Sequence, residues 1–171
     1  RHLPSTGSLY FASTNEGAFA RSLGQPLGAA IEVTVSATEP SKNSNSNSNI
    51  RLCEGAEPGH TDQITTAKAK ENLGSPPSFI QMDGMGKSCI VGAGGADAVI
   101  RLPPNGYQEA IWDHAAACHF VCEAGGKATD LDGKDLDFRY GRLLQKKVKG
   151  IVISNTRLHD TILEAIKKAR S

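Results

Sequence analysis

Three observations predict a layered α/β fold. Short runs rich in β-branched residues, such as residues 31–35 and 150–154, are typical of strands. Small and apolar side chains recur every three or four residues over 107–123 and 158–169, which is the spacing of one helix face. Because strand-type and helix-type segments follow one another along the chain, we expect sheets covered by helices, an α/β (α+β) architecture in layers.

The first third of the chain predicts an antiparallel sheet. Residues 9–12 and 31–35 have the aromatic, β-branched and alternating character of strands. Residues 16–17 and 24–26 contain the Gly and Pro that mark turns. We therefore expect these strands to pair through tight turns.

A Ser/Asn tract divides the chain. Residues 41–49 are too polar to bury, so they predict a surface loop. A short strand is expected at 50–53. On this basis residues 1–54 are interpreted as the end of an N-terminal sheet domain, and 55–171 as a C-terminal α/β domain.

The middle of the chain predicts a helix and a hairpin. The helix is expected from Thr61 to Leu73, with Thr61 as its N-cap and Gly74 as its stop. Residues 88–91 and 98–102 are expected to be strands separated by glycines.

The last third predicts two helices and two strands. The first helix is expected at 107–123, ended by the glycines at 125–126. Strands are expected at 128–131 and 150–154, followed by an amphipathic closing helix at 158–169.

The near-neutral net charge argues against partners that bind through strong overall electrostatic attraction. The 171-residue chain has 19 Lys and Arg against 18 Asp and Glu, a net charge of +1. Neither nucleic acid nor an anionic membrane is therefore expected as a partner. No apolar run is long enough to span a bilayer. Any anionic ligand must be held by local charges.

The cysteines favour a reducing compartment. Four cysteines in a domain of this size, without an expected signal peptide, are interpreted as reduced thiols in a cytoplasmic protein. Methionine occurs only at positions 82 and 85, so the sequence is interpreted as part of a longer protein. The four thiols belong to Cys53, Cys89, Cys118 and Cys122.

A glycine-rich segment at 89–96 is similar at first sight to a dinucleotide-binding loop. Its third glycine position is Asp97, and strand-type residues follow it up to Pro103. A pyrophosphate needs a helix N-terminus at this point. We therefore expect a tight β-hairpin and no nicotinamide or flavin site.

Two other patterns have simpler structural interpretations. Asp130 and Asp132 resemble the nucleophile loop of aspartate-based phosphatases, but no buried apolar strand directly precedes Asp130, so a turn at Asp132 is favoured. His114, Cys118 and Cys122 lie at i, i+4 and i+8 and could hold zinc. A small apolar cysteine that faces a sheet is an ordinary core residue, so we favour packing.

One block of residues resembles a known enzyme superfamily. Its parts are Ile-Trp-Asp-His-Ala-Ala-Ala at 111–117, Glu-Ala-Gly-Gly at 123–126 and Thr-Asp at 129–130. The block resembles the C-terminal signature of the lithium-sensitive, magnesium-dependent phosphatases, the superfamily of inositol monophosphatase and fructose-1,6-bisphosphatase. Further matches at 57–61, 82–87, 96–103 and 136–144 resemble the 3'(2'),5'-bisphosphate nucleotidases of that superfamily. The resemblance implies its mixed sheets with flanking helices.

Asp113 is the candidate metal ligand. A carboxylate in the first turn of a helix keeps its charge beside the positive end of the helix dipole, which suits it to hold a hard divalent cation. Taken as a residue alone, Asp113 could equally cap the helix. The resemblance implies that Asp113 binds Mg²⁺, the expected cofactor.

The resemblance also implies a set of substrate-binding residues. His60 and Lys87 would contact the substrate, and Arg101 would lie near the nucleotide or its 5'-phosphate. Lys87 and Arg101 suit phosphate chemically, as a point charge and as a planar fork. Gly84 stands at a further contact position where the nucleotidases usually have a Ser, so one hydrogen bond to the ligand is lost.

The expected function is Mg²⁺-dependent hydrolysis of adenosine 3',5'-bisphosphate to AMP and phosphate. The Asp-Pro-Ile-Asp-Gly-Thr segment that supplies most metal ligands in the superfamily does not occur in this chain. No catalytic residue is therefore assigned here, and the chain is interpreted as an inactive C-terminal half whose partner is the N-terminal half of the same protein. The alternatives are an inositol phosphate phosphatase and a non-catalytic nucleotide-binding fragment.

Overall fold

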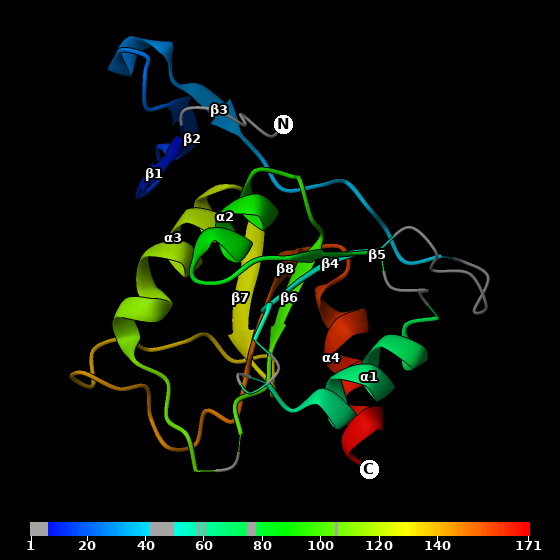
Figure 1. The fold of residues 1–171 in the computed structure, drawn as a ribbon. Coiled ribbons are helices and arrows are strands. Elements are labelled where there is room, and N and C mark those ends of the chain that lie inside the picture. Colours follow the sequence, from blue (N-terminus) through cyan, green and yellow to red (C-terminus); the bar gives the residue numbers. More distant parts are fainter. Residues whose placement is uncertain (1–6, 42–49, 58, 60, 75–77, 105) are drawn as a thin grey trace.

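The computed structural model describes residues 7–41, 50–57, 59, 61–74, 78–104 and 106–171. Within these residues the chain forms two sheets and four α-helices (Figure 1). A five-stranded sheet carries helices on both faces, and a smaller N-terminal sheet stands apart from it. The predicted layered α/β fold is confirmed.

The N-terminal sheet is antiparallel, as expected. Its three strands follow the order β1-β2-β3, and β2 fills the space between the two strands that the sequence predicted. The third strand is shorter than expected because the Val35 N–H turns away to donate to the Ala124 carbonyl at 3.0 Å. The strands are β1 (Ser8–Ser13), β2 (Gly17–Ser22) and β3 (Ile31–Val33).

The larger sheet has the strand order β5-β4-β6-β8-β7. Its strand β4 runs parallel to both β5 and β6, whereas β8 is antiparallel to β6 and β7. The carboxyl ends of β4, β5 and β6 therefore meet at one edge. The strands are β4 (Arg51–Glu54), β5 (Ser78–Gln81), β6 (Ala98–Arg101), β7 (Gly126–Asp130) and β8 (Ile151–Asn155).

Two helix layers cover this sheet (Figure 1). Helices α1 (Gln63–Asn72) and α4 (His159–Arg170) pack on one face, where Leu52, Leu73 and Ile162 belong to one buried cluster. Helices α2 (Gly86–Gly92) and α3 (Ala115–Glu123) pack on the other. The N-terminal sheet contacts α3, since the rings of Tyr10 and Phe120 meet edge to face at 5.6 Å between centroids.

The start of α1 corrects the expected N-cap. The helix begins at Gln63, and Asp62 caps it by accepting the Thr65 N–H at 3.1 Å. The Thr61 hydroxyl instead donates to the Leu102 carbonyl at 3.2 Å. Gly74 follows the helix with φ +64°, the conformation that ends a helix, so the predicted stop is confirmed.

The strand predicted at 88–91, and with it the hairpin, is wrong. Residues Gly86–Gly92 form α2, which follows the unpredicted strand β5. Val91 is fully buried and Gly92 lies against the Phe120 ring, so packing on α3 overrides the strand preference of β-branched residues. The glycines at 94–95 connect the C-terminal end of α2 to β6.

The helix predicted at 107–123 is also too long. A 3-10 turn spans Ile111–Asp113, and α3 begins only at Ala115. The preceding residues are extended because Ala110 bridges Leu143 and the Ile111 N–H donates to the Arg142 carbonyl at 3.0 Å. The C-terminal strands and closing helix agree with the prediction to within two residues.

The turn expected at Asp132 is present. Asp130 accepts the backbone N–H groups of Asp132 and Lys134, each at 2.9 Å, and Gly133 has φ +76°. Contrary to expectation, however, the strand β7 that precedes this turn has buried residues, Ala128 and Thr129. All four cysteines are free thiols, and Cys118 is buried as expected for packing, whereas Cys122 is exposed. Among the described residues, no helix combines the length and apolar character needed to cross a bilayer. The division between residues 54 and 55 stays a prediction.

Candidate active site

A cavity of about 490 Å³ lies where the parallel strands of the larger sheet end. The last residues of β4, β5 and β6, which are Glu54, Gln81 and Arg101, all line it. Ligands of open α/β sheets bind outside the carboxyl ends of the strands, and this volume is typical of a small-molecule site. The topology therefore places a candidate ligand site at this edge.

The turn between β5 and α2 forms one wall of the cavity. Gly84 has φ +68°, a conformation that a glycine adopts without strain, and no atom lies within 4 Å of the position a Cβ would take. The Asp83 carboxylate accepts the Ala56 N–H at 3.0 Å. This bond ties the turn to the loop that follows β4.

Lys87 lies in the first turn of α2 and faces the same cavity. Its ammonium donates to the Gly84 carbonyl at 3.0 Å. Partial burial lowers the pKa of Lys87, because desolvation disfavours the charged form. The cavity therefore presents a partly desolvated lysine that is hydrogen-bonded to the turn beside it.

A buried carboxylate joins two other parts of the wall. Glu109 accepts from Arg101 Nε at 2.7 Å and from His114 Nε2 at 2.9 Å, and its side chain is 3% exposed. Burial alone would raise the pKa of Glu109, but the hydrogen bonds from His114 and Arg101 outweigh it and lower the pKa. The Arg101 guanidinium also lies over the Tyr107 ring, 5.8 Å from its centroid.

Asp113 completes the wall from the 3-10 turn that precedes α3. Its side chain is exposed within the cavity. His114, and not Asp113, is the N-cap residue of α3, and its side chain makes no capping hydrogen bond. The alternative in which Asp113 caps this helix is thus not seen at the start of α3.

Asp113 fits part of a magnesium site. Carboxylate oxygen is the ligand that Mg²⁺ prefers, and protein sites often provide only one or two carboxylates, with water and substrate phosphate completing the shell. Among the described residues, no group of three or more His, Cys, Asp or Glu is arranged to hold a metal. The described part of the chain therefore does not assemble a complete metal site, and the role of Asp113 as a metal ligand stays a prediction.

The structure gathers four of the five predicted site residues around one cavity. Gly84, Lys87, Arg101 and Asp113 come from three separate segments of the chain and all line it. His60, the fifth, lies outside the described residues. The four described residues are thus neighbours in space although 29 positions separate the first from the last.

The predicted site set lacks four acidic residues of this cavity, Glu54, Glu57, Asp83 and Glu109, and two of them have a clear structural role. Asp83 holds the turn, and Glu109 pairs with Arg101 and His114. Asp83 directly precedes the predicted Gly84, which was a usable signal. Glu109 gave no such signal, because its role depends on a contact across the cavity.

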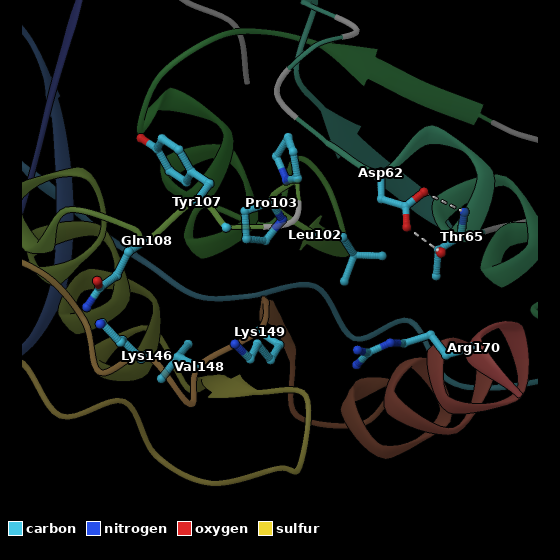
Figure 2. Close-up of a pocket in the computed structure, with 12 residues that line it drawn as sticks. Asp62, Thr65, Leu102, Pro103, Tyr107, Gln108, Lys146, Val148, Lys149 and Arg170 are labelled. Atoms are coloured by element: carbon cyan, nitrogen blue, oxygen red, sulfur yellow. Dashed lines mark hydrogen bonds between the residues drawn. The ribbon is translucent and has the colours of Figure 1, made fainter.

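A second cavity of about 480 Å³ lies toward α1 and α4 (Figure 2). Lys146, Lys149 and Arg170 line it, together with Asp62, whose carboxylate is engaged by Thr65. These four side chains are exposed. None of the four described site residues lines this second cavity. The predicted site residues therefore belong to the cavity at the ends of the parallel strands.

Comparison with known proteins decides the family. Residues 2–171 match the family model described as the inositol monophosphatase family. The chain belongs to the inositol monophosphatase family. The resemblance drawn from the Trp-Asp block is therefore confirmed.

Two relatives from different fungi are both named 3'(2'),5'-bisphosphate nucleotidase. A "3'(2'),5'-bisphosphate nucleotidase" of Emericella nidulans is 41% identical over 118 residues, which cover 68% of this chain and 33% of that protein. The "3'(2'),5'-bisphosphate nucleotidase 1" of Candida albicans is 33% identical over 99% of this chain and 47% of its own length. The chain thus spans between a third and about half of these relatives.

Solved structures agree on the inositol monophosphatase fold. Mycobacterium tuberculosis SuhB has a TM-score of 0.62 at 17% identity and covers 95% of this chain and 55% of its own. An inositol monophosphatase/NADP phosphatase complexed with NADP and Ca²⁺ has a TM-score of 0.62 at 21% identity, over 92% of this chain and 49% of its own. At these identities the likeness establishes the fold.

Proposed function

We propose that this chain is part of a Mg²⁺-dependent 3'(2'),5'-bisphosphate nucleotidase that hydrolyses adenosine 3',5'-bisphosphate to AMP and phosphate. The observation that carries the proposal is the meeting of Gly84, Lys87, Arg101 and Asp113 around one cavity at the end of three parallel strands. The names of the relatives support the same substrate class.

The cavity offers two kinds of group to a nucleotide bisphosphate. Lys87 and Arg101 supply positive charge for phosphate oxygens. Asp113 supplies a carboxylate, which would hold a divalent cation and not the phosphate itself. We assign His60 and Gly84 to substrate contact as well, because both lie in segments that resemble the nucleotidases.

When bound, Mg²⁺ supplies Lewis-acid stabilisation of phosphoryl oxygens and activation of water. In the overall reaction the oxygen of water attacks the 3'-phosphorus, the bond from phosphorus to the 3'-oxygen breaks, and that oxygen takes a proton. Lys87 and Arg101 bind and orient the substrate during this displacement. The remaining metal ligands and the residue that orients water are assigned to the N-terminal half of the same protein.

The N-terminal sheet supports a partner of this kind. Phe11 and Phe19 stack at 5.6 Å between ring centroids on the sheet, and Phe11 is 37% exposed. Ile31 on β3 is 64% exposed. Exposed apolar side chains on a sheet typically mark a surface that another segment covers, so we propose that the N-terminal half packs here.

Three broader assignments belong to the same proposal. The chain would divide into residues 1–54, the end of an N-terminal sheet domain, and residues 55–171, a C-terminal α/β domain. The four free thiols support a reducing, cytoplasmic location. The lithium sensitivity implied by the resemblance is also proposed.

The test is Mg²⁺-dependent phosphate release from adenosine 3',5'-bisphosphate by the protein as isolated, with the intact mass of every chain measured on the same sample. Asp113→Asn is the matched variant, because it keeps the side-chain shape and removes the charge that would hold the metal. We expect Mg²⁺-dependent turnover only where the N-terminal half is present, loss of that turnover in Asp113→Asn, and no turnover from this chain alone.

Other results would separate the alternatives. Faster turnover of inositol 1-phosphate than of the nucleotide would identify an inositol phosphate phosphatase. Nucleotide binding by an 18.1 kDa species without turnover would identify a half-site or a non-catalytic fragment. Turnover that is unchanged in Asp113→Asn would refute the assigned metal ligand.

A further inference from the structure

Glu109 is a deeply buried carboxylate in a cavity that is proposed to bind phosphate. Its carboxylate lines the same cavity as Lys87 and Arg101 and is 3% exposed. A negative charge at this place repels an anionic ligand. The cost of this repulsion to ligand binding must therefore be offset by another effect of Glu109.

The two oxygens of Glu109 engage two different parts of the wall. One accepts from Arg101 Nε at 2.7 Å, and the other is 2.9 Å from His114 Nε2. Arg101 ends β6, whereas His114 directly follows Asp113 and precedes α3. A single side chain thus connects the candidate phosphate-binding residue to the segment that carries the candidate metal ligand.

The backbone around Glu109 is fixed from the opposite side. The Glu109 carbonyl accepts the Leu144 N–H at 2.9 Å, and the neighbouring Ala110 forms a β-bridge with Leu143. Leu144 is 1% exposed. The Glu109 side chain therefore extends from a backbone segment that is held by hydrogen bonds. A carboxylate on such a segment can hold other side chains in place.

The charge of Glu109 is maintained despite its burial. An isolated buried carboxylate would be strongly destabilising, and a charged partner together with further hydrogen bonds offsets that cost. Arg101 and His114 supply those bonds. Each partner is in turn held in one orientation, with side-chain exposures of only 22% and 12%.

We propose that Glu109 is a positioning residue that orients Arg101 and His114 toward the cavity and thereby sets the affinity for a phosphate ester. This inference rests on the proposed function for its ligand, adenosine 3',5'-bisphosphate. It assigns to Glu109 no contact with the reacting atoms.

The direction in which Glu109→Gln changes the affinity for the ligand distinguishes a positioning role from a purely electrostatic one. Glu109→Gln keeps the side-chain volume and removes one negative charge from the cavity. If Glu109 acted only through its charge, the variant would bind an anion more tightly. If Glu109 positions Arg101, the variant binds more weakly, by roughly 10-fold or more, because a charged hydrogen bond is lost.

The measurement is the Kd of adenosine 3',5'-bisphosphate by calorimetry for the wild type and Glu109→Gln, with urea unfolding of both proteins. Glu71→Gln is the control for the loss of one negative charge, since Glu71 is an exposed carboxylate on α1 that does not line the cavity. We expect Glu71→Gln to bind like the wild type and Glu109→Gln to bind more weakly. Equal or tighter binding by Glu109→Gln overturns the proposal.

A double-mutant cycle measures whether the effect of Glu109→Gln on the Kd depends on Arg101. A merely structural role of Glu109 would not produce this dependence. In an Arg101→Met background, Glu109→Gln should change the Kd by less than about threefold, because residues in one network are not additive. A full 10-fold effect in that background overturns the proposal. If Glu109→Gln does not fold, Glu109→Asp keeps the charge and shortens the reach, and an unchanged Kd for that variant overturns the proposal.

Failure of the proposed function has a different signature. A wild type that binds inositol 1-phosphate but not the nucleotide refutes the nucleotidase, and the Glu109 comparison is then made with inositol 1-phosphate. A wild type that binds neither ligand overturns both. A wild type that binds the nucleotide while Glu109→Gln binds it equally well overturns only the role of Glu109.

Discussion

The carboxylate of Asp97 accepts the backbone N–H of Arg51 at 2.6 Å and its guanidinium at 2.9 Å. The same carboxylate accepts from the hydroxyls of Ser36 and Thr38, and its side chain is fully buried. One charged group therefore joins the start of β4 to the segment that leaves the N-terminal sheet. This cluster is one of the contacts that join the N-terminal segment to the larger sheet, beside the Tyr10–Phe120 ring contact.

The first prediction concerns acid stability. Burial raises the pKa of Asp97, but the hydrogen bonds from Arg51, Ser36 and Thr38 outweigh it, so the pKa lies below its ordinary value. A lowered folded-state pKa contributes stability that is present above the unfolded pKa of about 3.9 and is lost as the pH falls through the folded value. We expect urea unfolding to show this loss below about pH 4 in the wild type and a smaller loss in Asp97→Asn.

At neutral pH, Asp97→Asn should lower the free energy of unfolding by about 2–3 kcal/mol, because it leaves Arg51 without its buried partner. Asp160→Asn is the matched control. Asp160 is 90% exposed, and its Oδ1 lies as far as 3.9 Å from Lys127 Nζ. Because such a surface pair contributes little, Asp160→Asn should lower the free energy of unfolding by less than about 0.5 kcal/mol. Equal effects of the two substitutions would contradict the role of Asp97.

The second prediction concerns nucleotide affinity at alkaline pH. Burial lowers the pKa of Lys87, so its ammonium loses the proton at a lower pH than an ordinary lysine would. We expect the affinity for adenosine 3',5'-bisphosphate to fall with rising pH before the ordinary lysine pKa of about 10.4 is reached. Calorimetry from about pH 7 to 10 measures this fall.

Two variants test whether Lys87 causes the fall. Lys87→Gln should bind roughly 10-fold more weakly at neutral pH and show a flatter profile. Lys68→Gln removes the charge of an exposed lysine on α1 and should keep the wild-type profile. A wild-type profile retained in Lys87→Gln would show that another group titrates.

The third prediction concerns the contact between α2 and α3. A Cβ added at Gly92 would lie 2.4 Å from Cε1 of Phe120, and that ring is 4% exposed and packs against Tyr10. Because the ring cannot easily move, Gly92→Ala should cost about 1–3 kcal/mol of unfolding free energy. Gly28→Ala, where nothing lies within 4 Å, is the control and should leave the thermal midpoint nearly unchanged. Equal midpoints for the two variants would rule out a tight contact.

The sequence predicts strands and helices best where local pattern and packing agree. The amphipathic pattern of 158–169 matches α4, whose buried residues include Ile162 and Ile166. The pattern fails at α2, because Ile90 and Val91 favour strands in isolation while packing against α3 selects a helix. It also fails before Asp113, where the Ala110–Leu143 bridge keeps the chain extended.

The site follows the same logic. Lys87, Arg101 and Asp113 carry recognisable motifs, so their convergence on one cavity could be expected from resemblance. Glu109 acts through Arg101 and His114, two residues on other elements. A contact of this kind depends on tertiary geometry, which local sequence patterns do not encode.

The last prediction uses the unusual residue Gly84. Its φ of +68° strains any other side chain, by about 1 kcal/mol, although the Cβ position itself is open. Gly84→Ser and Gly84→Ala should therefore destabilise the chain equally, and they differ by one hydroxyl. If this turn contacts the substrate, Gly84→Ser should bind adenosine 3',5'-bisphosphate about 2- to 10-fold more tightly than Gly84→Ala, the value of one hydrogen bond. Identical Kd values for the pair would place the substrate away from this turn, because the shared strain cancels in the comparison.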